Sequence, residues 1–152
     1  MCSSDLKRPA TLGDLVADLL ALEREFGNRQ IDLRCSVLSV ETEPIVLEGM
    51  DLGRFRIALD WSRWEDDQPY DIIALEPNPA AGNSAVTHPH IEQDGLCTGE
   101  GRLPIRQALA EGRLFDLFLL IRQILSTYNP DKRAALRCFK AAVSSVMRAD
   151  PA

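Results

Sequence analysis

The chain has 152 residues, of which 45% are hydrophobic, so it can bury a sizeable core, and we expect one domain over residues 1–152. Its formal net charge is −6 and its basic residues are dispersed, which argues against nucleic acid as a partner. No apolar run approaches the roughly twenty residues of a membrane span, and the first residues lack a signal-peptide core, so we expect no membrane partner and a cytoplasmic location.

The first predicted element is an amphipathic helix from Thr11 to Phe26. Apolar residues recur there at helical spacing, Thr11 is placed as the N-cap, and Gly27 is placed as the stop.

Strands are predicted next. From Ile31 to Val37 apolar and polar residues alternate, which predicts a strand with Leu33 and Cys35 on its buried face. Further strands are expected around residues 45–47, 55–59 and 70–75. These runs indicate an antiparallel meander of about four strands.

Residues 76–104 contain eight prolines and glycines, so regular helix or central strand is not expected there. Long connections of this kind are usually functional or disordered, and we place the candidate site in this one. Pro104 then suits the first position of a short helix that ends at Gly112.

The C-terminal third is predicted to be helical. Residues 114–128 carry a broad apolar stripe typical of a buried helix, and residues 132–148 predict a final amphipathic helix with basic residues opposite its apolar face. The order of helix, strand meander, long loop and helices predicts an α+β fold.

The four cysteines are widely spaced and include no C-x-x-C pair, so free thiols are expected. Cys35 and Cys138 are expected in the core, and Cys2 is expected to be a loose terminal thiol. Cys97 lies in a glycine-flanked loop, where spacing alone leaves open a reactive nucleophile and a small buried hydrophobe.

The loop also contains His88-Pro89-His90, followed by Gly95-Leu96-Cys97. This run resembles the active-site segment of ubiquitin-conjugating (UBC) enzymes, in which His-Pro-Asn precedes the cysteine that carries a thioester. The order of elements is also similar, with Asn129-Pro130-Asp131 between the last helices. The Gly95 to Gly101 run and the helix from Gly112 to Asn129 look more like the bacterial branch, which is encoded beside ubiquitin-like proteins and JAB-type proteases. The resemblance therefore implies the UBC fold.

The resemblance also implies an enzyme, a ubiquitin-like protein transferase. Cys97 would receive a ubiquitin-like protein from an activating enzyme and pass it to a target lysine, with no metal or organic cofactor. His90 stands in place of the family's asparagine and would stabilise the oxyanion, which would make catalysis pH-dependent. His88 would hold the loop by hydrogen bonding, and Asn129 or Asp131 would border the acceptor amine. The bacterial relatives imply a pathway of antiviral defence.

Other interpretations remain open at this stage. A catalytically inactive UBC-like scaffold would only bind a ubiquitin-like protein or partner enzyme. A zinc site could use His88, His90 and Cys97, although it needs a fourth ligand. A hydrolytic Cys-His enzyme would need its base on the same short loop, with no orienting third residue in view.

Overall fold

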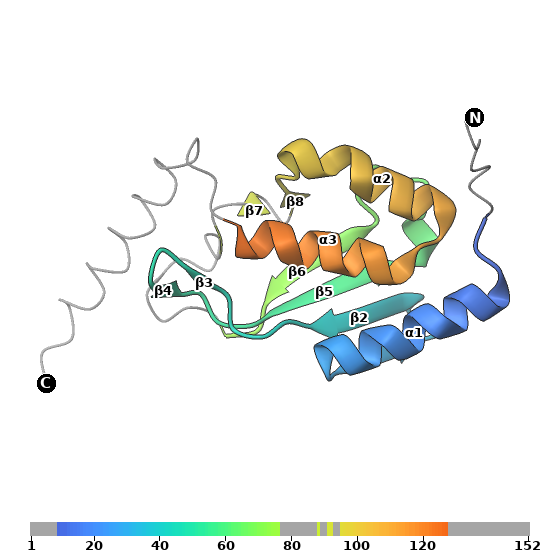
Figure 1. Ribbon diagram of the computed structural model, residues 1–152, viewed down its shortest axis with the longest axis horizontal. Helices are drawn as coiled ribbons and strands as arrows, with labels where there is room; N and C mark the ends of the chain where they lie inside the picture. The colour runs from blue at the N-terminus through green and yellow to red at the C-terminus, as the bar shows by residue number, and fades with distance from the viewer. Residues whose placement is uncertain (1–8, 77–87, 89–90, 93–94, 128–152) are drawn as a thin grey trace, which may run out of the picture.

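The computed structural model describes residues 9–76, 88, 91–92 and 95–127 (Figure 1). These residues form an N-terminal helix, an antiparallel sheet and two later helices, which confirms the predicted α+β class. The helices are α1 (Leu12–Phe26), α2 (Arg102–Glu111) and α3 (Leu114–Ser126), with short 3-10 turns η1 (Trp61–Arg63) and η2 (Gly99–Gly101). The main sheet contains β1 (Arg29–Asp32), β2 (Val37–Glu41), β5 (Phe55–Asp60) and β6 (Tyr70–Ala74). Two small ribbons pair β3 (Val46–Leu47) with β4 (Met50–Asp51), and β7 (Ile91–Glu92) with β8 (Gly95–Leu96).

The helix α1 has the boundaries that its sequence predicts. The Thr11 hydroxyl accepts the Asp14 N–H at 3.2 Å, and the Asp14 carboxylate accepts the Thr11 N–H at 2.8 Å, which makes a reciprocal capping box. At the other end Gly27 adopts φ 71°, and its N–H donates to the Glu23 carbonyl at 3.0 Å. Both ends are therefore fixed by local hydrogen bonds.

The predicted strand from Ile31 to Val37 is wrong, because a turn interrupts it. One oxygen of the Asp32 carboxylate accepts the N–H groups of Arg34 and Cys35, at 2.9 and 3.0 Å, and Ser36 takes a left-handed φ of 59°. These bonds end β1 and reverse the chain into β2. Cys35 is consequently exposed in the turn, not buried on a strand face as its alternation suggested.

The main sheet is antiparallel throughout and has the order β1-β2-β5-β6. Four strands were predicted, but the run around residues 45–47 lies in the β3–β4 ribbon and not in this sheet. Rows of buried side chains cross the strands: Leu38 pairs with Leu59 and Leu59 with Tyr70, while Val40 pairs with Ile57 and Ile57 with Ile72. These rows form the sheet side of the core.

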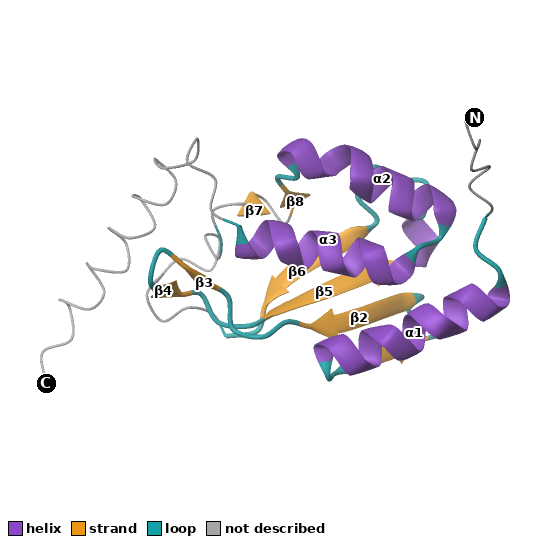
Figure 2. Cartoon of the chain, in the orientation of Figure 1, coloured by secondary structure: helices purple, strands orange, loops and turns teal. Residues whose placement is uncertain are grey.

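The helices supply the other side of the core and lie on one face of the sheet (Figure 2). The helix α3 contacts both α1 and α2, and four of its residues are fully or almost fully buried, namely Leu117, Phe118, Ile121 and Leu125. This confirms the predicted buried helix as far as Ser126; the rest of the stripe, and the predicted helix over residues 132–148 with Cys138, lie outside the described residues, as does Cys2.

The helix α2 begins at Arg102, two residues before the predicted start, so Pro104 is its third residue and not its first. Proline is tolerated there because the first N–H groups of a helix have no partner within it. Because α2 begins at Arg102, the irregular segment predicted over residues 76–104 is shorter than expected. The β7–β8 ribbon also lies within that segment. Gly112 ends α2 with a φ of 68°, as predicted.

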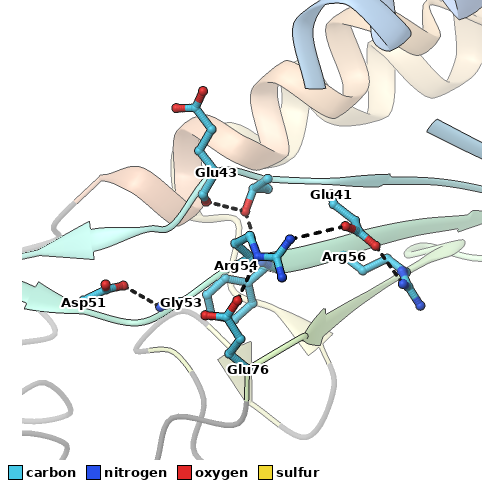
Figure 3. A network of polar contacts seen from close by, with 9 residues as sticks. Glu41, Glu43, Asp51, Gly53, Arg54, Arg56 and Glu76 are labelled. Carbon is cyan, nitrogen blue, oxygen red and sulfur yellow. Dashed lines mark hydrogen bonds and ion pairs between the residues drawn. The ribbon is translucent and has the colours of Figure 1, made fainter. Parts of the chain in front are cut away.

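The opposite face of the sheet carries ion pairs (Figure 3). Glu41 accepts from Arg56 at 2.8 Å and lies 3.8 Å from Arg54, which donates to Glu76 at 2.8 Å. The Arg56 guanidinium lowers the pKa of Glu41, and Asn28 adds to that effect. This network joins the ends of β2, β5 and β6.

Among the described residues, no helix has the length and apolar content that crossing a membrane would require.

Candidate functional site

Cys97 lies directly after β8 and two residues before η2, and its thiol is exposed and free. Exposure excludes the interpretation of this residue as a small buried hydrophobe. A thiol in this position can be reached by a macromolecular partner, which a covalent acyl carrier requires.

The β7–β8 ribbon determines what lies near Cys97. Ile91 pairs with Leu96 and Glu92 pairs with Gly95 in antiparallel register. Ile91 and Leu96 are both buried, which anchors the ribbon on the core. The strand that follows the His-Pro-His run therefore lies beside the strand that leads into Cys97.

Gln68, which the sequence did not mark as a site residue, binds the backbone of β8 through its side chain. The Gln68 side-chain amide donates to the Leu96 carbonyl at 2.8 Å, and its oxygen accepts the Leu96 N–H at 3.2 Å. Both main-chain groups of the residue before Cys97 are thus bound by one half-buried side chain. Twenty-eight residues separate the two positions, and no local pattern around Gln68 marks it for this role.

The residue before Gln68 makes a second link to the same region. The Asp67 carboxylate accepts from Arg102 at 3.0 Å and lies 3.8 Å from Arg106, both on α2. These ion pairs are well exposed, so each contributes little to stability. They join the segment before β6 to the helix that follows Cys97.

His88 is buried, with 1% of its surface exposed, and its ring fixes the start of the ribbon. Its Nε2 lies 2.7 Å from the Leu125 carbonyl oxygen, and its ring meets the Phe55 ring edge-on at 5.5 Å. A carbonyl oxygen only accepts, so Nε2 must carry a proton. The His88 carbonyl in turn accepts the Ile91 N–H at 3.0 Å. Through these contacts His88 joins the beginning of β7 to the end of α3.

The remaining predicted site residues are the proposed oxyanion donor and the residues on the acceptor side. His90, Asn129 and Asp131 lie outside the described residues. The structure therefore places His88 before the β7–β8 ribbon and Cys97 directly after it, and the oxyanion donor and the acceptor-side residues stay predictions.

Within the part of the chain that the structure describes, no three histidine, cysteine, aspartate or glutamate side chains gather as metal ligands. His88 and Cys97, the two members of the zinc interpretation that are described, differ in environment, since one is buried and the other exposed.

Comparison with known proteins yields no match among family models, curated proteins or solved structures.

Proposed function

We propose that this chain is a UBC-like conjugating enzyme that carries a ubiquitin-like protein as a thioester on Cys97. The observation that carries the proposal is an exposed cysteine at the end of a ribbon whose backbone is held by Gln68 on one side and by buried His88 at its start. The UBC-like fold is part of this proposal, supported by the chain order of α1, an antiparallel sheet, the cysteine segment and the later helices.

The chemistry consists of two acyl transfers. The Cys97 thiolate attacks the thioester carbonyl that joins the ubiquitin-like protein to the activating enzyme, and the activating enzyme's thiolate leaves. A lysine amine then attacks the new thioester, an amide bond forms, and Cys97 leaves as a thiolate while the amine loses its proton. The attack of the amine passes through a tetrahedral oxyanion, so a hydrogen-bond donor beside the thioester would speed the discharge step.

The roles of the other residues follow from the resemblance. His90 would donate to the oxyanion, and Asn129 or Asp131 would border the incoming amine. His88 would fix the loop, a role that its burial and its bond to Leu125 support.

The test is intact-mass analysis without reductant after incubation with ATP, an activating enzyme and a ubiquitin-like protein of the kind that the resemblance implies. We expect a thiol-cleavable adduct on the unmodified chain and none on Cys97→Ala. Cys35→Ala is the matched control, because Cys35 is the other free, exposed cysteine of the described residues, and it should charge normally.

A second variant tests the departure from the family's asparagine. His90→Ala should slow discharge of the thioester to lysine about a hundredfold, as expected for loss of one oxyanion donor, while charging stays nearly normal. Equal discharge rates would remove His90 from the mechanism. No adduct on the unmodified chain, with partners shown to be active, would contradict the proposal and favour a scaffold that only binds its partner.

A further inference from the structure

A wide apolar groove lies at the end of the molecule formed by the β1–β2 turn, and it is separate from Cys97. Its volume is about 530 Å³, and apolar side chains from α1, the turn and η1 line it, among them Leu15, Leu19, Ile31, Leu33, Trp61 and Trp64. Leu33 is 80% exposed and both tryptophans are more than one third exposed. A surface of this kind in water is typical of a binding site.

The apolar surface continues onto α1. Leu12, Val16 and Leu20 follow one another at four-residue spacing, so they form a stripe on one side of the helix. They are 79%, 48% and 46% exposed, whereas Leu22 on the inner side is fully buried. The groove and this stripe together form one apolar surface on which a partner helix could lie.

Acidic residues flank the groove on two sides. Asp14, Asp18 and Glu111 line an adjoining hollow that shares Ala10 and Gly112 with the groove. Glu65, Asp66 and Asp67 line another, which shares Trp64 and Leu109 with it. Among the described residues that line these two hollows, carboxylates outnumber the basic side chains, which are Arg113 and Arg106. The chemistry of the surface therefore suits an apolar helix with a basic edge.

We propose that the occupant is the chain's own C-terminal segment, residues 132–148, folded back as an amphipathic helix. Leu136, Phe139, Val143, Val146 and Met147 give this segment its apolar stripe. Residues 128–152 carry a net charge of +3, against −6 for the whole chain, so residues 1–127 carry −9. Apolar pattern and charge both complement the groove.

The C-terminal segment is long enough to reach the groove from the end of α3. The groove includes Leu114 at the start of α3, and α3 is 13 residues long, so its far end is about 20 Å away at 1.5 Å per residue. A helix over residues 132–148 is about 25 Å long. After a turn at Asn129-Pro130-Asp131, it would run back far enough for its apolar stripe to reach the groove. The docked segment would cover Leu12, Val16 and Leu20 on its way.

The two tryptophans of the chain, Trp61 and Trp64, both line the groove, so acrylamide quenching of their fluorescence reports its occupancy. In the full-length chain, Phe139→Asp should roughly double the quenching constant and shift the emission to the red. Ser145→Asp, which adds the same charge on the other face of the predicted helix, should leave both unchanged. Equal quenching of Phe139→Asp and the unmodified chain would overturn the proposal.

Concentration separates this occupant from a second copy. We expect quenching of the unmodified chain to be independent of protein concentration, because docking within one chain is unimolecular. Quenching that weakens as concentration rises would assign the groove to self-association and overturn the proposal.

A second measurement changes the groove instead of the segment. Leu33 lies in an exposed turn, so the Leu33→Asp variant should still fold. Because a charge in the groove should release the docked segment, we expect trypsin to cleave this variant after Arg137 and Lys140 at least five times faster than the unmodified chain. Gln30→Asp is the matched control, since Gln30 is exposed and its β1 position alternates with Ile31 onto the other face of the sheet. Equal cleavage in both variants would also contradict docking.

Discussion

Cys35 and Cys97 are both exposed, but their surroundings differ. The Asp32 carboxylate accepts a hydrogen bond from the Cys35 thiol, which raises the pKa of Cys35 and disfavours its thiolate. Cys97 instead follows a backbone segment that Gln68 holds by two hydrogen bonds. At the scale of single residues, Cys97 is therefore the better candidate for the proposed nucleophile, and Gln68 fixes the backbone of the residue before it.

Gln68→Ala tests that positioning role. Acyl transfer between two proteins needs the thiol at a fixed place, so we expect charging to slow about tenfold, within the range that misplacement costs. Alkylation of Cys97 by iodoacetamide needs an exposed thiolate but no alignment with a protein partner, so it should change less than twofold. Gln30→Ala, an exposed glutamine on β1, is the control and should leave both rates unchanged. Normal charging in Gln68→Ala would show that the clamp is dispensable.

Tyr70, at the start of β6, gives an alkaline prediction. Burial, together with the Asp67 carboxylate, raises the pKa of Tyr70 to about 12, from 10.0 in the unfolded chain. Its contribution to stability is therefore complete below pH 10 and is lost as the pH rises toward 12. Between these values the free energy of unfolding should fall by about 2 kcal/mol more in the unmodified chain than in Tyr70→Phe. Urea titrations at the two pH values measure the difference, and parallel losses would contradict it.

At the scale of elements, α1 and α3 support each other across 97 residues of sequence. The N-cap of α3, Arg113, makes no side-chain capping bond. The Asp18 carboxylate of α1 instead accepts the Phe115 N–H at 3.3 Å. A carboxylate at this place also interacts favourably with the positive end of the helix dipole. The start of α3 is thus capped by another helix.

Asp18→Ala should remove this cap and lower the free energy of unfolding by about 1 kcal/mol, the usual cost of losing a capping side chain. Asp18→Asn retains an acceptor oxygen without the charge and should lose about half as much. Urea denaturation measures both. Identical losses in the two variants would mean that the bond to Phe115 makes no contribution.

At the scale of the whole molecule, two kinds of surface cover the sheet. The helices bury its core face, whereas its other face is held by ion pairs around Glu41 and Arg54 (Figure 3). The stability that the buried core face provides should be insensitive to pH and salt, whereas the stability that the ion pairs provide should respond to both. Acid is therefore expected to weaken the molecule from the open face of the sheet.

The acid prediction follows from Glu41, whose pKa is lowered by hydrogen bonds from Arg56 and Asn28. Its stabilising contribution is present above its unfolded pKa, near 4.5, and is lost as the pH falls through the lower folded value. The Tm should therefore drop between pH 5 and pH 3, and less steeply in Glu41→Gln. Glu43→Gln, an exposed neighbour, should follow the unmodified chain; if Glu41→Gln does so too, the network has no part in acid unfolding.

Sequence patterns succeeded where the decisive interactions are local. The N-cap at Thr11, the stop at Gly27 and the apolar stripe of α3 were all predicted, because each depends on residues within a few positions of one another. The alternation from Ile31 to Val37 misled because a strand and a tight hairpin can share the same pattern. The Asp32 carboxylate, which binds the next turn of backbone, decides between them.

The sequence by itself therefore determined the α+β class, most helix boundaries and the candidate cysteine. Only the tertiary structure decided what holds that cysteine's loop, since Gln68 binds Leu96 across 28 residues and His88 binds Leu125 across 37. It also decided that Leu12, Val16 and Leu20 remain exposed beside an apolar groove, although their spacing matches that of core residues. Periodicity depends on neighbours along the chain, whereas burial and long-range hydrogen bonds depend on which elements pack together in space.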